Sequence, residues 1–156
     1  MHFSLIHVSE KPSAWLQAAC SHYSSRLPPE FGFSDIVLPP ARRTKNSHLA
    51  TLRSQEWLQI CAKVPKSSAL VLLDERGKSY SSAQFSQQIQ RWQQAGQDIC
   101  FVIAGADGVN PEHRQQVSSS ISLSAMTLPH EMARLMLLEQ LYRAWSIAAN
   151  HPYHRV

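Results

Sequence analysis

The chain alternates short apolar segments with helical patterns, and this order restricts its fold more than any other feature. Five apolar segments are predicted as β-strands, over 3–8, 33–38, 69–74, 99–105 and 121–128. Most of the segments between them, and the one after the last, carry apolar residues at the three- and four-residue spacing of an amphipathic helix. A repeated strand–helix order predicts an α/β domain with a mostly parallel sheet flanked by helices.

Local signals mark several helices. Trp15 is predicted on the buried stripe of the first helix, and Leu49 on that of the second. Ser81 and Gln84 have the spacing of a capping box, which opens a helix. The last helix is predicted over 130–149, with an apolar side along much of its length.

Length and composition exclude several classes of protein. A chain of 156 residues corresponds to a single domain, 1–156, with enough residues for a core. With 44% hydrophobic and 17% charged residues, the chain is not a disordered one. There is no apolar run long enough for a membrane helix, and the first residues lack the features of a secretory signal. Cys20, Cys61 and Cys100 are odd in number and far apart, which fits a reducing cytoplasm rather than a disulfide framework or a zinc site.

The net charge of +4 is unevenly spread. No acidic residue lies between Asp35 and Glu56, and this stretch contains Arg42, Arg43 and Lys45. A basic segment on a small domain predicts a polyanionic partner. Judged from charge alone, a solvated basic loop without a binding partner explains the segment as well as a polyanion-binding site does.

Three loops follow predicted strands, where open α/β sheets bind their ligands. The loops come after Leu73, after Ala104–Gly105 and around 124–129. The turn 104–108 contains two glycines but lacks the third glycine of a dinucleotide fingerprint. Taken alone, each pattern is more common as an ordinary turn or as a strand with a solvent face.

The C-terminal residues carry side chains that can bind RNA and transfer a proton. Arg155 can bind phosphate, Tyr153 can stack on a base, and His154 can move a proton near neutral pH. His151 and His154 form a pair with metal-ligand spacing, but no further ligand is evident and no metal is expected. A frayed tail is the structural alternative.

Together, the segments LD (73–74), IAGADG, LSAMTLPH, EQLYRAWSI and NHPYHR resemble the RlmH family. These are small bacterial methyltransferases of the SPOUT, or α/β-knot, superfamily. The resemblance covers essentially the whole chain and is strongest from Leu123 to Arg155. The chain departs from the family pattern at Ala104, where the family usually has glycine.

The resemblance implies methyl transfer from S-adenosylmethionine to N3 of a pseudouridine in 23S ribosomal RNA of the assembled ribosome. It also implies a homodimer and a C-terminal trefoil knot. The implied cofactor contacts are Leu73, Ala104, Gly105, Gly108, Leu123, Ser124, Ala125, Met126, Thr127 and Leu128. The implied catalytic and RNA-facing residues of the C-terminal region are Arg143, Tyr153, His154 and Arg155. The segment with Arg42, Arg43 and Lys45 is expected to bind RNA phosphates.

The hypothesis assigns a task to each catalytic residue. Arg143 and Arg155 hold phosphates and stabilise the ring anion, His154 relays the N3 proton, and Tyr153 helps to hold the base. Because so short a tail does not easily fold over its own cofactor loops, we expect it to complete the partner's site in a C2 dimer packed through the last helix.

Two alternatives come from other classes of protein. One is a non-catalytic ribosome- or RNA-binding factor that has kept the fold. The other is a nucleotide-dependent oxidoreductase in which 104–108 is a degenerate dinucleotide turn.

Overall fold

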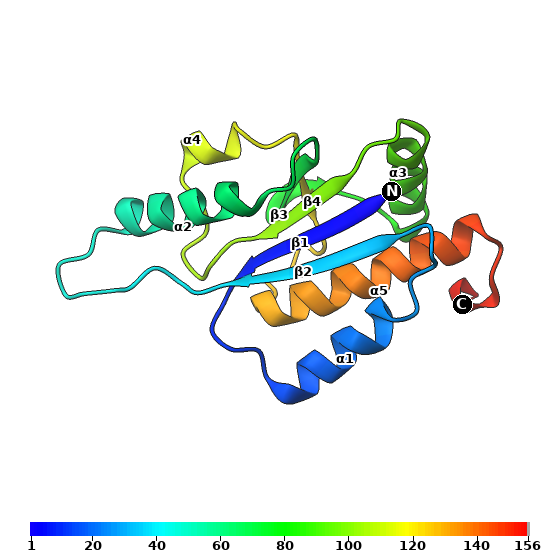
Figure 1. Cartoon of the computed structure of the whole chain (residues 1–156), viewed down its shortest axis with the longest axis horizontal. Helices are drawn as coiled ribbons and strands as arrows, with labels where there is room; N and C mark the ends of the chain where they lie inside the picture. The colour runs from blue at the N-terminus through cyan, green and yellow to red at the C-terminus, as the bar shows by residue number, and fades with distance from the viewer. Residues whose placement is uncertain (156) are drawn as a thin grey trace.

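The computed structural model describes residues 1–155 as a sheet with helices on both faces (Figure 1). Its elements are β1 (His2–Val8), α1 (Ala14–Ser24), β2 (Gly32–Leu38), α2 (Leu49–Lys63), β3 (Ala69–Ser79), α3 (Ser82–Gln94), β4 (Ile99–Ile103), α4 (Pro111–Arg114), β5 (Ser119–Ser122), α5 (His130–Ala148) and the 3-10 turn η1 (Pro152–His154). None of the helices in this range is long and apolar enough to cross a membrane.

The five strands form one sheet in the order β2-β1-β4-β3-β5, and every pair is parallel. This confirms the predicted α/β class. Alternate residues of β4 face opposite layers, because successive side chains of a strand point to opposite faces. Phe101 packs in the core beneath α3 and α5, whereas Val102 packs in the core beneath α2. In Figure 1, α2 and α4 lie on one side of the sheet and α1 and α5 on the other.

The capping box predicted at the start of α3 is confirmed. The backbone nitrogen of Gln84 donates to Ser81 Oγ at 3.1 Å, and the backbone nitrogen of Ser81 donates to Gln84 Oε1 at 2.9 Å. The two bonds satisfy N–H groups that the first turn of a helix leaves unpaired.

The fifth predicted strand, 121–128, is wrong over most of its length. The observed strand β5 ends at Ser122, and the chain then turns. Ser122 Oγ donates to the backbone oxygen of Ser124 at 2.9 Å, and the backbone nitrogen of Met126 donates to Ser124 Oγ at 2.9 Å. Serine hydroxyl groups thus form hydrogen bonds with backbone groups that would otherwise pair with a neighbouring strand, and the segment becomes a loop.

Smaller differences concern strand ends and two helix residues. Strand β3 runs beyond 74 to Ser79, and β4 ends at Ile103 rather than at 105. Trp15 and Leu49, predicted on buried stripes, are 62% and 45% exposed. Both lie in the first turn of their helices, where the neighbouring Leu16 and Leu52 face the core instead. The implied trefoil knot stays a prediction.

Strand β3 bulges between Leu73 and Lys78, and both of these residues pair with Ile121 of β5. Gly77 lies in the bulge, where a Cβ atom would lie 2.6 Å from the backbone nitrogen of Ile121 and 2.6 Å from the carbonyl carbon of Ser120. Backbone atoms of a paired strand cannot move aside as a flexible side chain does. Only glycine therefore fits where the bulge passes β5.

We expect Gly77→Ala to lower the free energy of unfolding by about 2–3 kcal/mol, because the new methyl group overpacks the β3–β5 contact. Urea denaturation measures the change. Lys78→Ala, at the exposed neighbouring position, is the control and is expected to stay within about 0.5 kcal/mol of wild type. Equal denaturation midpoints for the two variants would contradict the close approach.

Candidate functional site

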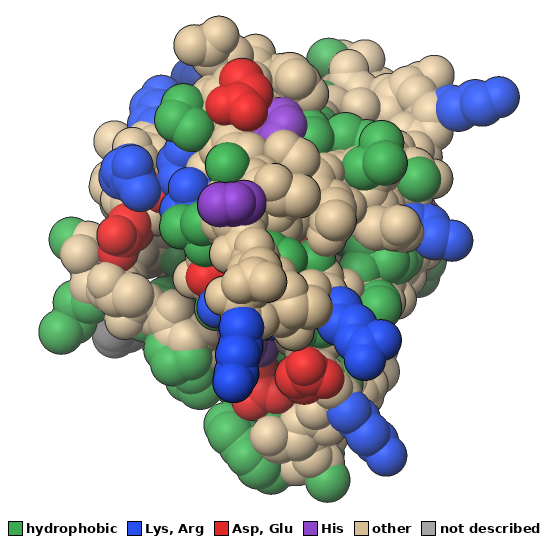
Figure 2. Space-filling view, turned by 90° about the vertical axis from the view of Figure 1, so that its left-hand side faces the viewer, with side chains coloured by type: hydrophobic (Ala, Val, Ile, Leu, Met, Phe, Trp, Pro, Cys, Tyr) green, Lys and Arg blue, Asp and Glu red, His purple; other side chains and the backbone are tan. Residues whose placement is uncertain are grey.

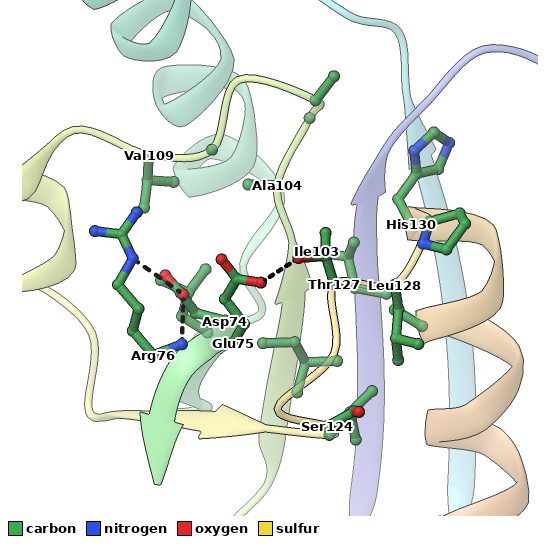
Figure 3. A pocket seen from close by; sticks show the side chains of 18 of the residues that line it. Asp74, Glu75, Arg76, Ile103, Ala104, Val109, Ser124, Thr127, Leu128 and His130 are labelled. Carbon is green, nitrogen blue, oxygen red and sulfur yellow. Dashed lines mark hydrogen bonds and ion pairs between the residues drawn. The ribbon is translucent and has the colours of Figure 1, made fainter. Parts of the chain in front are cut away.

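A cavity of about 450 Å³ opens at the carboxyl ends of β3 and β4, as expected for an open α/β sheet (Figure 3). Its walls come from the bulge of β3, the turn after β4 and the connection from β5 to α5. All the residues predicted to contact the cofactor line this cavity, except Ala125. Residues 73, 104–108 and 123–128 are distant in sequence, so only the folded sheet brings them together.

The two glycines of the turn after β4 have different tasks. Gly108 has a positive φ of 73°, and its nitrogen donates to the backbone oxygen of Gly105 at 2.9 Å. A Cβ atom on Gly105 would lie 2.7 Å from Oε1 of Glu56. Glycine at 105 therefore leaves room for a carboxylate of α2 beside the cavity wall.

Glu56 is a site residue that the sequence analysis missed. It is only 7% exposed, and its Oε2 accepts a hydrogen bond from the backbone nitrogen of Ala41 at 3.3 Å. It thereby holds the start of the basic segment against the turn after β4. A signal was present in the sequence, because Glu56 occupies the apolar stripe of α2 between Leu52 and Ile60, one turn from each.

The basic segment lies beside the cavity. Arg42, Arg43 and Lys45 are exposed in the irregular stretch between β2 and α2. Arg43 forms an ion pair with Asp107, which lines the cavity. Arg53 of α2 donates from Nε to the backbone oxygen of Asp107 at 2.7 Å. Figure 2 views the molecule from this side and shows Lys and Arg side chains projecting over the surface.

The C-terminal residues gather around Glu139, a second residue that the sequence analysis did not single out. Arg143 donates from Nε and Nη2 to Oε1 of Glu139, at 2.9 and 2.6 Å. The hydroxyl of Tyr153 donates to the same oxygen at 3.0 Å. The guanidinium of Arg143 also lies 5.1 Å from the centre of the Tyr153 ring. The sequence did carry a signal for this pair, because Glu139 and Arg143 are four residues apart and so lie one helical turn from each other.

These contacts fix the protonation of both partners. The hydrogen bond to Glu139 raises the pKa of Arg143, so the guanidinium stays charged. Burial, together with hydrogen bonds to Tyr23 and Glu139, raises the pKa of Tyr153. Tyr153 is therefore a neutral phenol near pH 7, able to donate a hydrogen bond but not to act as a base.

Unlike Arg143 and Tyr153, His154 and Arg155 form no hydrogen bond with Glu139 in the described part of the chain. The Nδ1 atom of His154 is buried and has no hydrogen-bond partner within residues 1–155. Arg155 is exposed, and its backbone nitrogen donates to Pro152.

The cavity and the C-terminal residues lie at opposite ends of α5. His130 and Ala133, at the start of this helix, line the cavity. A helix of 19 residues is about 28 Å long at 1.5 Å per residue, and η1 follows its far end. Figure 1 shows the C-terminus at the end of the molecule opposite the loop between β2 and α2. The chain therefore does not bring its own tail to its own cavity.

A family model described as "Predicted SPOUT methyltransferase" matches residues 1–154. The chain belongs to the SPOUT methyltransferase family. This confirms the predicted superfamily, and it favours methyl transfer over the oxidoreductase and non-catalytic alternatives. As a SPOUT methyltransferase, the protein uses S-adenosylmethionine as its methyl donor.

Two similar proteins share its full length. The chain is 42% identical to the ribosomal RNA large subunit methyltransferase H of Herminiimonas arsenicoxydans over 156 residues, which is 100% of both chains. It is also 42% identical to the protein of the same name from Ralstonia pickettii (strain 12J), again over 100% of both. The SpoU methyltransferase AviRb from Streptomyces viridochromogenes, solved with AdoMet, aligns with a TM-score of 0.46 and 12% identity over 90% of this chain and 56% of that one.

The cavity fits the methyl donor of a SPOUT methyltransferase. A volume of about 450 Å³ lies in the range of small-molecule sites. Leu73, Ile103 and Leu128 supply apolar walls suited to an adenine ring, while Ser124 and Thr127 supply polar groups. The methyl group of Ala104 is part of the wall, and the cavity remains open beside it. Within residues 1–155, no group of three or more His, Cys, Asp or Glu side chains is arranged to hold a metal ion.

Proposed function

We propose that the protein methylates N3 of a pseudouridine in 23S ribosomal RNA, and that it acts on the assembled ribosome in the cytoplasm. The observation that carries the proposal is the full-length similarity to methyltransferases named for large-subunit ribosomal RNA. The basic segment beside the cavity supports it, because ribosomal RNA is a polyanion. Bound in the cavity, S-adenosylmethionine supplies an electrophilic methyl group.

The chain's own residues have separate tasks in this proposal. The loops at 73, 104–108 and 123–128 hold the cofactor, and Arg42, Arg43 and Lys45 bind RNA phosphates. Tyr153 helps to hold the base through its ring, because its hydroxyl donates to Glu139, and Arg143 and Arg155 hold phosphates and stabilise the ring anion. Glu139 fixes the position of Arg143 and Tyr153. His154 relays the N3 proton.

We propose that the working unit is a homodimer, in which the tail of one copy completes the cavity of the other. The length of α5 separates a tail from its own cavity, which supports sharing between two copies. Helices α1 and α5 pack against each other through Leu16, Cys20 and Leu138, which are buried. Trp15 is largely exposed on α1, and Leu135 on α5 is only partly buried. A second copy packed through α5 would cover such a surface.

Methyl transfer to ribosomes that lack the modification tests the proposed function. We expect the protein to transfer labelled methyl groups to these ribosomes, and mass spectrometry to find N3-methylpseudouridine in the digested RNA. A different methylated nucleoside would contradict the proposed target. Equal transfer to free 23S RNA would contradict the requirement for the assembled ribosome.

We expect His154→Ala to lower single-turnover methyl transfer about 100-fold, because the relay of a proton by a positioned side chain contributes a factor of this order. Calorimetry is expected to show unchanged affinity for S-adenosylmethionine, since the residues that line the cavity are unaltered and the task proposed for His154 is on the RNA base. His154→Gln, which keeps hydrogen bonding but not proton relay, is the matched variant and should be equally slow. Full turnover in either variant would remove His154 from the mechanism.

A further inference from the structure

Three carboxylates line the cavity, and two of them are neutralised by cations of the same chain. Asp74 forms an ion pair with Arg114, and Asp107 forms one with Arg43. Glu75 differs from both. Within residues 1–155 its side chain has one hydrogen-bond partner, the uncharged hydroxyl of Thr127, at 2.7 Å, and no ion pair. The cavity thus keeps one carboxylate that forms no ion pair with any cation in the described range 1–155.

The contact of Glu75 joins two walls of the cavity. Glu75 belongs to the bulge of β3, and Thr127 belongs to the connection between β5 and α5. In Figure 3 the two side chains point toward each other from separate segments, and a dashed line joins them. Within residues 1–155 the neighbouring Arg76 pairs with Asp74 rather than with Glu75, with its Nε 4.0 Å from Oδ1 of Asp74, and its side chain is mostly exposed. The side chains of Glu75 and Thr127 are both exposed, so the carboxylate of Glu75 lies at the open wall of the cavity, directed toward Thr127 and accessible to a ligand.

The methyl donor and its product differ in charge at one atom. The sulfonium of S-adenosylmethionine is positive at every pH and has no N–H or O–H group, so hydrogen bonds cannot recognise it. After transfer, S-adenosylhomocysteine has the same amino acid, ribose and adenine, but its sulfur is neutral. An unbalanced carboxylate attracts the donor more strongly than the product.

We propose that Glu75 determines specificity for the cationic donor over the neutral product. The inference rests on the proposed binding of S-adenosylmethionine in this cavity. The charge of Glu75 strengthens the binding of the donor and adds nothing to the binding of the product. It thus limits inhibition by the product and favours its release after each transfer.

Calorimetric titration of wild type and Glu75→Gln with both ligands tests the proposal. Glutamine keeps an oxygen to accept the Thr127 hydrogen bond and removes only the charge. We expect the Kd of S-adenosylmethionine to rise about three- to tenfold, because the variant loses an attraction between two partly solvated charges. The Kd of S-adenosylhomocysteine should change less than about twofold. Added salt should reduce the preference of wild type for S-adenosylmethionine over S-adenosylhomocysteine. It should have little effect on the ratio of the two affinities in Glu75→Gln.

Two control variants separate charge from other causes. Glu75→Asp keeps a negative charge in the cavity wall and shortens the side chain by one methylene group, so a preference for the donor should remain. Glu112→Gln removes the same charge from α4, outside the cavity lining, and should also leave the preference unchanged. Loss of preference in either control would overturn the assignment to the charge of Glu75.

The remaining outcomes are equally decisive. If Glu75→Gln weakens both ligands to the same degree, Glu75 contacts a group that they share, and the proposal is wrong. If neither affinity changes, solvent screens the carboxylate, and the proposal is again wrong. Failure of wild type to bind either ligand would instead contradict the proposed cofactor site, so the two failures are distinguishable.

Discussion

An equimolar mixture of an Ala104→Leu variant and a His154→Ala/Arg155→Ala variant is expected to recover about one quarter of the wild-type methyl transfer. Each variant alone should have very little activity, because leucine fills part of the cavity and the double substitution removes two tail side chains. Random exchange makes about half of the dimers mixed. In each mixed dimer, one of the two sites combines an intact cavity with an intact tail.

The structural reason for this result is the separation along α5. His130 and Ala133 line the cavity at one end of the helix, and Tyr153 packs on Glu139 toward the other end. Co-expression with two different affinity tags allows mixed dimers to be purified, and these should show about half of the wild-type rate. A mixture of two cavity variants, Ala104→Leu and Leu128→Trp, is the control and should remain inactive. Inactive mixed dimers of the first pair would place each site within one chain.

The Asp35→Ala substitution is expected to lower the free energy of unfolding by about 3–5 kcal/mol, because it leaves a buried cation without its counter-ion. Arg134 of α5 is only 2% exposed. Its Nη2 donates to Gln17 at 3.0 Å and to the carboxylate of Asp35, while its Nε and Nη1 have no partner in the range 1–155. His7 Nε2 lies 3.0 Å from the other oxygen of Asp35. Urea denaturation at pH 7 measures the loss.

A double variant provides the matched control. Asp35→Ala/Arg134→Met removes both charges and replaces arginine with an apolar side chain of similar length, so much of the lost stability should return. A double variant no more stable than Asp35→Ala would show that the loss arises from packing rather than from the unpaired charge.

The same ion pair predicts how stability depends on pH. Burial opposes ionisation of Asp35, but hydrogen bonds from His7 and Arg134 outweigh it and lower the pKa of this carboxyl. The unfolded chain, with a pKa of about 3.9, therefore binds the proton more readily. The contribution of Asp35 is fully present above about pH 4–5 and is lost as the pH falls through the lower folded value. The stability difference between wild type and Asp35→Ala should shrink in that acidic range and stay constant above it.

Much of the cavity was predictable because its residues carry local signals. Gly105 and Gly108 follow a buried strand, and the loops after parallel strands meet at one edge of the sheet. Glu56, Glu139 and Glu75 were not predicted as site residues, because their importance lies in partners far away in the sequence or in the absence of a nearby cation. Ser122 and Ser124 misled the strand prediction, since their hydroxyl groups support either a solvent-facing strand or the observed turn.

The sequence by itself determined the order of strands and helices along the chain, the α/β class and the resemblance to a methyltransferase family. These depend on periodicity and on motifs, which are local properties of the chain. Only the tertiary structure decided that the basic segment lies beside the cavity and that α5 separates the tail from the cavity. It also decided that Glu75, among the lining carboxylates of residues 1–155, has no ion pair. These facts depend on distances between residues remote in sequence, and such distances are set only when the helices pack on the sheet.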